Sequence, residues 1–573
     1  MPFRASRPVA PWICLAGVLC GFLAYVAWLH PVNFFGYSED DTIYFSTAKA
    51  LAEGRGYILP SFPGTPRATK YPVLLPWLLS RIWRINPSFP SNISLAVWVT
   101  PIFACGFFIA AFEFLRERQG LGDWPALLIV AFCAFHPYFL IFSAQVLSDM
   151  IFLAVALAAA MLADSALRRN GRIATALAAG LVAGLSVGLR TVGLAVVAGI
   201  LVAGIYRRTW RQAAILALAA SPLVLLALGP LFGDLRSIPA ANPTAAEPGW
   251  AQTAAYATTY LKFWRLSVPN LASFRSVLWT NLQGFVMQPG SYLVAPLLPE
   301  TAVRVAVTAV LSAVMFAGIV RQARAEEWKP VHFMFVFYTA MILPWDYPMM
   351  GRFLMLFLPL FLAGLWIEGK HFLEMLALGS RSGRSLTERI LAGTLWLALA
   401  ALAVTAVWNY GDGLRPQLAG ISARRGALLP EKKEAYDWIR EHTDPQTTVV
   451  AYEDEALYLY TGRQSVRPIE FSTESYYRHD TARAQRDLDH ITDAAWHVRA
   501  RYWMIAGDDY GLERMVPLPM IDARMAQLRS ALPVVFRSRQ GNVQIYDLAC
   551  LLEPQKPECL AVAPALFPYA SAR

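Results

Sequence analysis

The feature that most constrains this chain is a series of eleven long apolar runs without Asp, Glu, Lys or Arg. A helix that crosses a bilayer needs about 20 largely apolar residues, or somewhat fewer where protein surrounds it. Runs of this kind cover residues 11–29, 92–112, 124–142, 150–163, 173–189, 191–206, 212–233, 305–320, 331–345, 353–367 and 390–410. Only 16% of all residues are charged, against about a quarter in soluble domains. The sequence therefore predicts a polytopic α-helical membrane protein with about eleven transmembrane helices.

The distribution of charge divides the chain into two domains. The formal net charge of +10 could indicate a nucleic-acid partner. However, residues 412–573 carry 20 Lys and Arg against 22 Asp and Glu, so the basic excess lies entirely in the apolar part. We therefore expect a transmembrane domain at residues 1–411, a soluble domain at residues 412–573, and no nucleic-acid partner.

The positions of the basic residues predict the orientation in the membrane. Alternate connecting segments carry 17 Lys and Arg, whereas the three short loops on the other side hold only Arg190 and Arg352. Basic residues favour the cytoplasmic side, so we expect a cytoplasmic N-terminus in the cell inner membrane and an extracytoplasmic C-terminal domain. This pattern requires residues 173–206 to form two short helices that meet at Arg190. Two outer loops are long, at residues 30–91 and 234–304, and the second is rich in aromatic and basic residues that suit a helix at the membrane interface.

The tail from residue 412 is predicted to be an α/β unit. Residues 431–441 have helical spacing, residues 447–451 and 502–506 resemble buried strands, and residues 456–460 resemble a short helix that ends at Gly462. Two further strands, at residues 534–536 and 543–546, flank the turn sequence at Gly541. Cys550 and Cys559 lie in this domain, where a disulfide is chemically permitted, and the sequence leaves their pairing open.

Common enzyme motifs are absent from the sequence. There is no Walker loop, dinucleotide fingerprint or HExxH motif. Gly184–Gly188 spells G-x-S-x-G, but it lies inside an apolar run rather than at a strand-turn-helix. Gly180, Gly184 and Gly188 instead favour close packing of this helix against another. A group-transfer reaction would therefore need a donor presented by the membrane or from outside the cell.

The first outer loop carries an acidic cluster. Ser38 is followed by Glu39, Asp40 and Asp41, and the same loop contains Arg55, Arg67 and Lys70. One interpretation is a helix start, because Ser38 and Asp41 spell a capping box and acids favour the first turn of a helix. The other is a reaction site at the bilayer surface, where a carboxylate deprotonates a hydroxyl beside a lipid phosphate that is released.

This loop resembles the first external loop of the C-type (GT-C) membrane glycosyltransferases. The shared residues are Asp40-Asp41-x-x-Tyr44, Ala48, Leu51, Gly54-x-Gly56-Tyr57, Lys70-Tyr71-Pro72 and Pro76. The resemblance is greatest to the branch of protein O-mannosyltransferases and aminoarabinose transferases, which have Asp-Glu-x-x-Tyr and Lys-Pro-Pro here. This chain departs at Asp41 and Tyr71. Weaker similarity continues at Ser148-Asp149, Gly184–Arg190, Arg352 to Pro359 and parts of the tail, so it covers nearly the whole chain.

The resemblance implies an inverting enzyme that moves a sugar from a polyprenyl-phosphate carrier to an extracytoplasmic lipid, glycan or protein. Asp40 matches the family's catalytic acid and would be the general base, with Asp41 as a second catalytic candidate. Candidates to bind the substrate or its phosphate are Lys70, Arg67, Arg190, Arg352, Asp149 and Tyr44. Several have simpler alternatives, since Lys70 and Arg67 could be solvated loop charges, Arg352 an interfacial anchor and Asp149 a helix cap. Whether the site binds a divalent metal ion stays open, and Asp41, Glu39 and Asp149 are the candidate ligands.

Two other classes of function remain as alternatives. A polytopic transporter or lipid flippase would use the same charges along a permeation path, and it predicts inverted repeats and charges near the bilayer midplane. No convincing repeat occurs in the sequence, and charges other than Arg190 gather at the outer face. A non-catalytic assembly subunit is the third interpretation, and it predicts that Asp40→Asn leaves activity intact. The sugar and the acceptor are not identified by the sequence.

Overall fold

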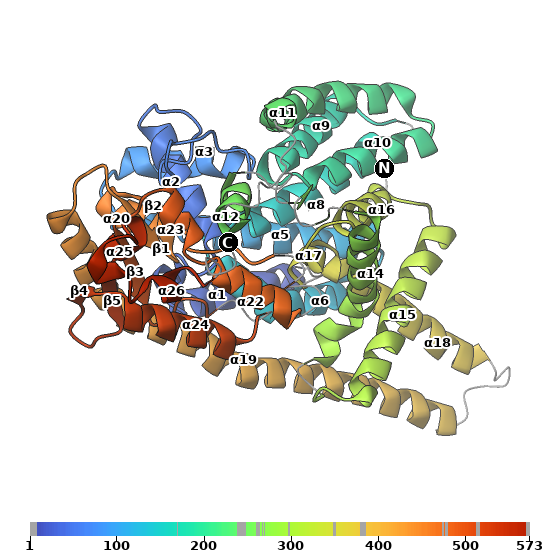
Figure 1. Cartoon of the computed structure of the whole chain (residues 1–573). Coiled ribbons are helices and arrows are strands. Elements are labelled where there is room, and N and C mark those ends of the chain that lie inside the picture. Colours follow the sequence, from blue (N-terminus) through green and yellow to red (C-terminus); the bar gives the residue numbers. More distant parts are fainter. Residues whose placement is uncertain are drawn as a thin grey trace.

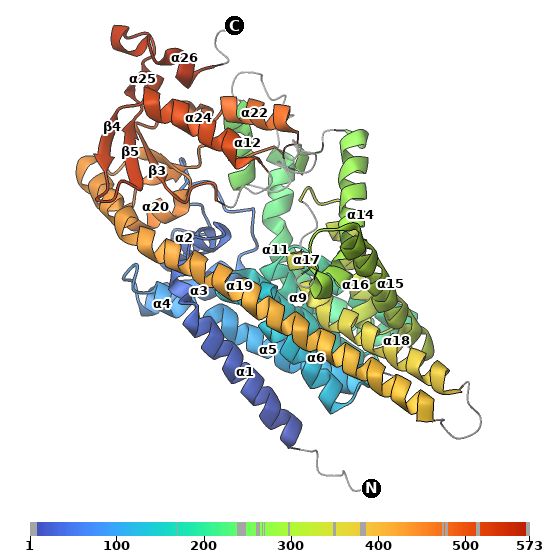
Figure 2. The same ribbon diagram turned by 90° about the horizontal axis from the view of Figure 1, so that it is seen from below.

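The structure is a computed structural model, and it places most of the chain. The residues described are 9–168, 170–237, 248–258, 264–265, 268, 270–295, 298–347, 351–378, 386–472, 475, 480–511 and 516–568. Figure 1 shows a large helical part, with a small sheet packed at one side of it. In Figure 2 the start of α1 (Ala10–Trp28) lies at the opposite end of the molecule from the strands.

Helices make up nearly all of the chain before residue 443. In the first half they are α2 (Asp40–Ala52), α3 (Leu74–Ile85), α4 (Ile93–Ala96), α5 (Val99–Glu113), α6 (Asp123–Phe135), α7 (Pro137–Ser143), α8 (Ser148–Ala166), α9 (Ile173–Leu189), α10 (Gly193–Tyr206) and α11 (Trp210–Ser237). They continue with α12 (Pro248–Thr258), α14 (Leu271–Val294), α15 (Ala302–Ala325), α16 (Pro330–Ile342), α17 (Gly351–Leu354), α18 (Leu358–Leu378) and α19 (Leu386–His442). The helical, polytopic character predicted from the apolar runs is therefore confirmed.

Fewer of the described helices are long enough to span a membrane than the eleven that the sequence predicted. Within the described residues, six helical segments are long and apolar enough to cross a membrane, and α6 with α7, bent by 56°, would make a seventh. Three more of the predicted runs form the shorter apolar helices α9, α10 and α16. The eleventh run lies in α19, which continues past it as one 57-residue helix. The exact count of eleven is not confirmed.

Small residues allow the helices to approach closely. A Cβ atom at Gly180 of α9 would lie 2.4 Å from the carbonyl oxygen of Leu216, and one at Gly184 would lie 3.0 Å from that of Ala220. Both carbonyls belong to α11, so the glycine face predicted for this segment packs against a helix. The predicted break at Arg190 is also present, because α9 ends at Leu189 and Arg190 has an extended backbone.

The C-terminal region is a five-stranded mixed sheet with helices on it. Its strands are β1 (Thr448–Ala451), β2 (Gln464–Val466), β3 (Tyr502–Ala506), β4 (Val534–Arg537) and β5 (Val543–Asp547), in the order β2-β1-β3-β5-β4. β2, β1 and β3 are parallel, while β5 is antiparallel to both β3 and β4. The helices here are α20 (Asp454–Thr461), α22 (Thr481–Asp489), α23 (Asp493–His497), α24 (Leu518–Ala531), α25 (Ala549–Leu552) and α26 (Ala563–Leu566). Cys550 and Cys559 form a disulfide.

α19 connects the helical part to the sheet without a break. Its C-terminal part packs on the sheet through a small core that includes Tyr436, Ile439, Met504 and Ile545. Figure 2 shows α19 running beside the bundle and ending under the strands. The predicted domain boundary at residues 411/412 falls inside this helix, and the division into two domains stays a prediction.

Candidate active site

Four charged residues meet where several helices begin or end. Asp40 is the first residue of α2, and Asp149 is the second residue of α8. Arg190 lies between α9 and α10, and Arg352 is the second residue of α17. The local sequence favours this arrangement. Acidic residues suit the first turn of a helix, and Arg190 lies in the short break between two apolar helices. Residues separated by more than 300 positions thus converge at one site.

These residues form a continuous network of ion pairs. The Arg352 guanidinium donates two hydrogen bonds to Asp149, both at 2.9 Å, and a third to Oδ2 of Asp40 at 3.2 Å. The Nη1 of Arg190 lies 2.8 Å from Oδ1 of Asp149. Two guanidiniums and two carboxylates therefore share a partly buried site. Charges in such a place are stable only when each has a partner, and Asp149 is the partner of both arginines.

Aromatic hydroxyl groups border the network. Tyr71 donates a hydrogen bond of 2.6 Å from its hydroxyl to Oδ1 of Asp40. The hydroxyl of Tyr44 lies 3.1 Å from that of Ser148, and the rings of Tyr44 and Tyr71 are 4.8 Å apart. Burial raises the pKa of Tyr44 above its usual value, so this phenol is neutral at physiological pH. Both oxygens of Asp40 thus have partners, one a phenol and the other an arginine.

Asp41 lies in a different environment from Asp40. It is fully buried, and its two oxygens accept the backbone N–H groups of Gly36, at 3.0 Å, and Thr42, at 2.8 Å. Burial raises the pKa of Asp41 to about 7. Its observed contacts hold the turn before α2 and do not include the arginines of the network.

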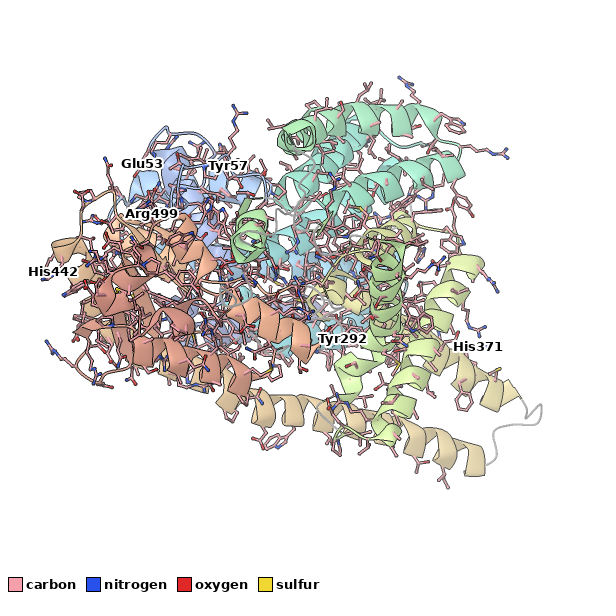
Figure 3. All side chains as sticks on the ribbon, viewed as in Figure 1. Glu53, Tyr57, Tyr292, His371, His442 and Arg499 are labelled. Atoms are coloured by element: carbon pink, nitrogen blue, oxygen red, sulfur yellow. A yellow bond between two sulfur atoms is a disulfide. The ribbon has the colours of Figure 1, made fainter. Side chains whose placement is uncertain are left out.

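The two basic residues predicted from the loop differ in position. Lys70 is buried, and its ammonium lies 3.3 Å from the ring centre of Tyr256 in α12. Burial raises the pKa of Glu39, and the charges of Arg467 and Lys70 oppose this rise, so the charge of Lys70 lies near the start of α2. Arg67 is exposed at the surface, where its backbone pairs with Ile58. The structure therefore brings Lys70 close to the site and leaves Arg67 at the periphery. Figure 3 shows Tyr57, from the same loop, at the upper left of the view.

α19 holds the segment that leads to Asp40. The Arg425 guanidinium donates to the carbonyl oxygens of Asn33, at 3.0 Å, and Phe35, at 2.9 Å, and to Glu453 at 2.9 Å. Lys432 also contacts Glu453, at 2.8 Å. Burial alone would raise the pKa of Glu453, but Lys432 and Arg425 outweigh it and lower the pKa to about 2. The C-terminal region is thereby tied to the loop that carries the site.

The three acids predicted as metal ligands do not form one group. Asp41 contacts backbone amides, and Asp149 contacts two arginines. Glu39 instead lies with Asp454 and Glu455 of α20, and one carboxylate oxygen from each residue lies within 4.8 Å of the others. Among the described residues this is the acidic group whose geometry could hold a metal ion.

Several residues of the site were missed by the sequence reasoning. Tyr71 carried a signal, because it stands where the resembled family has Pro. The run Glu453-Asp454-Glu455 after β1 was a second signal, since acids that follow a strand often gather at the edge of a sheet. Arg425 and Arg467 carried none, because only the folded chain brings them to residues 33–39.

Comparisons with known proteins found similarity in structure only. No protein-family model matches the chain, and no curated protein matches its sequence. It is similar to the crystal structure of ArnT from Cupriavidus metallidurans bound to undecaprenyl phosphate, with a TM-score of 0.47 and 13% identity over 92% of this chain and 98% of that one. The apo form of that protein gives a TM-score of 0.45 at 13% identity over the same shares.

The oligosaccharyltransferase of Archaeoglobus fulgidus, in complex with Zn and sulfate, gives a TM-score of 0.48 and 13% identity over 88% of this chain and 69% of that one. These proteins are GT-C membrane glycosyltransferases, the group that the first-loop residues resemble. The structural match extends over about 90% of this chain.

Proposed function

We propose that this chain is an inverting glycosyltransferase that moves a sugar from a polyprenyl-phosphate carrier to an extracytoplasmic lipid, glycan or protein. The observation that carries the proposal is the contact of Asp40 with Arg352, which in turn shares Asp149 with Arg190. A carboxylate that can accept a proton contacts one cation, Arg352, which is linked through Asp149 to a second cation, Arg190. General-base catalysis and stabilisation of a departing anion need these two features side by side.

The proposed reaction begins at the acceptor. Asp40 takes the proton of the acceptor hydroxyl, whose oxygen then attacks the anomeric carbon of the sugar. The bond from that carbon to the carrier phosphate breaks, and its electron pair leaves with the phosphate oxygen. The Tyr71 hydroxyl donates a hydrogen bond of 2.6 Å to Oδ1 of Asp40, and it orients the carboxylate that takes the proton of the acceptor. A well-placed base is worth roughly 10²–10⁴-fold in rate.

The leaving phosphate is assigned to Arg352, Arg190 and Lys70. An arginine can bind two phosphate oxygens at once, whereas Lys70 offers a single point charge. Asp149 positions both guanidiniums, and Tyr44, hydrogen bonded to Ser148, forms the wall next to Asp40. Asp41 is assigned a supporting role at the turn before α2, and the exposed Arg67 is left outside the site.

The proposal includes a membrane topology. We assign eleven spans in the inner membrane, a cytoplasmic N-terminus and an extracytoplasmic domain from about residue 412. Support comes from a second group of charges, in which Arg118 and Arg207 lie 3.0 and 2.9 Å from Asp164 near the end of α8. This group is at the opposite end of α8 from Asp149, as expected for basic residues on the cytoplasmic side.

An assay in lipid vesicles tests this function. The purified chain is reconstituted with a panel of radiolabelled polyprenyl-phosphate sugars and extracted cell-envelope acceptors, and the release of free polyprenyl phosphate is measured together with labelled product. The proposal predicts that both appear in equal amounts with at least one donor. Movement of intact donor across the bilayer with no release of polyprenyl phosphate would instead identify a flippase. A matched set of vesicles without protein corrects for spontaneous hydrolysis.

A further inference from the structure

An acidic group lies between the first outer loop and the C-terminal sheet, outside the residues assigned to the transfer reaction. Glu39 precedes Asp40, while Asp454 and Glu455 begin α20 directly after β1. One carboxylate oxygen of each lies within 4.8 Å of the other two. Ligand oxygens bound to one Ca²⁺ ion lie 2.3–2.6 Å from it, so no two of them are more than about 5.2 Å apart. The three carboxylate oxygens are close enough together to bind one cation.

Glu455 provides an independent observation. It is only 6% exposed, and its Oε2 atom has no hydrogen-bond partner among the described residues. A buried carboxylate oxygen without a partner is strongly unfavourable, because it has lost its hydration and gained nothing. An unpartnered buried oxygen in a converging acidic group is free to bind a cation.

The charged neighbours of the group favour a cation. Glu39 forms an ion pair with Arg467. Within the part of the chain that the structure describes, no lysine or arginine forms an ion pair with Asp454 or Glu455, and both of these carboxyl groups are buried. A buried place that gathers carboxyl groups without basic partners suits a cation.

We propose that Glu39, Asp454 and Glu455 bind one hard divalent cation of the Ca²⁺, Mg²⁺ or Mn²⁺ type. Carboxylate oxygens are the ligands these ions prefer, and three of them leave coordination positions for water. The ion joins the residue that precedes Asp40 to the first turn of α20. It thereby fixes the start of α2 relative to the C-terminal sheet, in addition to the contacts that Arg425 makes.

Binding to the purified, full-length chain in detergent tests this site without any measurement of sugar transfer. The protein is treated with EDTA, freed of the chelator, and titrated separately with CaCl₂, MgCl₂ and MnCl₂ by isothermal titration calorimetry. The expected result is saturable binding of one cation per chain, with a melting temperature that rises with the cation concentration. No saturable binding of any of the three ions up to about 10 mM, above the range of weak protein Ca²⁺ sites, would overturn the proposal.

Variants locate the binding. Glu455→Gln keeps the shape of the side chain and removes its charge, so the affinity should fall at least tenfold. Asp437→Asn, at an exposed acid in the same region, and Asp40→Asn should bind as the wild type does. Unchanged affinity in Glu455→Gln would contradict the site. If Glu455→Gln does not fold, Asp454→Asn gives the same comparison. Cation binding by Asp40→Asn is measured without sugar transfer. If this variant binds the cation as the wild type does, the cation site stands even if the proposed transferase function fails.

Discussion

Asp40 is a carboxylate with both oxygens engaged by groups of different chemistry. The Tyr71 hydroxyl contacts one oxygen at 2.6 Å and Arg352 contacts the other at 3.2 Å. The phenol is the shorter contact, and it comes from a residue that departs from the Lys-Pro-Pro pattern of the resembled family. Tyr71 therefore orients the proposed base through a phenol, where the resembled family has a proline.

Loss of the Tyr71 hydroxyl should slow sugar transfer while leaving the fold intact. A hydrogen bond to a charged group contributes about 1.5–3 kcal/mol, so Tyr71→Phe is expected to lower kcat/KM about tenfold or more. Initial rates in vesicles, with wild type and variant at equal protein content, measure the change. Tyr206→Phe, at an exposed tyrosine at the far end of α10, is the control. Equal rates for Tyr71→Phe and wild type would show that the hydroxyl does not position Asp40.

Asp41 should make stability depend on pH. Its pKa is about 7 in the folded chain, against about 3.9 in an unfolded chain. The folded state therefore binds the proton more tightly, so this group's contribution to stability is complete below about pH 4 and is lost as the pH rises through 7. We expect the melting temperature of the wild type to fall between pH 5 and pH 8, and to fall less in Asp41→Asn. A fall of the same size in both proteins would contradict this assignment.

At the scale of helices and strands, the sequence predicted most of the elements. Each of the eleven apolar runs lies mostly in helical structure, and the break at Arg190 is present. The strands at 448–451, 502–506, 534–537 and 543–547 lie where alternation and turn signals placed them. The short strand β2 and the helices α22 to α24 were not predicted. β2 has three residues, too few for a periodic pattern, and its pairing depends on β1.

The contact between α9 and α11 depends on the absence of a side chain at Gly180. A Cβ atom there would lie 2.4 Å from a backbone oxygen of Leu216, which cannot move without shifting α11. Gly180→Ala should therefore destabilise the protein by about 1–3 kcal/mol, the usual effect of overpacking. Thermal unfolding in detergent measures this. Gly17→Ala is the matched control, because nothing lies within 4 Å of a Cβ at that position. A melting temperature unchanged by Gly180→Ala would mean that the two helices pack less closely.

At the scale of the whole molecule, the sequence predicted many of the residues of the site but not how they pair with one another. Asp40, Arg190, Arg352 and Asp149 were each singled out, and the structure brings them together. Their pairing could not be derived, because it depends on how four helix ends meet in space. The contributions of Arg425 and the acids of α20 depend on the docking of the C-terminal sheet, for which the local sequence contains no signal. Figure 1 shows α19 linking these distant regions.

The contacts of Arg425 should govern the stability of that docking. Arg425→Gln removes the charged donor of the carbonyl groups of Asn33 and Phe35, and one of the two charged donors of Glu453. Removing one partner of a buried ion pair costs roughly 3–5 kcal/mol, less here because Lys432 still contacts Glu453. We expect a lower melting temperature and faster proteolysis of residues 30–91. Arg424→Gln, at the exposed neighbour, should have little effect. Equal loss in both variants would contradict a specific role for Arg425.

The most direct test of the whole account is the rate of sugar transfer by Asp40→Asn. Asparagine keeps the size of the side chain and can still contact Arg352 and Tyr71, but it cannot accept the proton of an acceptor hydroxyl. With the donor that the wild type uses in vesicles, the account predicts a loss of about 10²-fold or more, with unchanged thermal stability and unchanged binding of the carrier lipid. Transfer by Asp40→Asn at the wild-type rate would contradict the assignment of the base and, with it, the proposed reaction at this site.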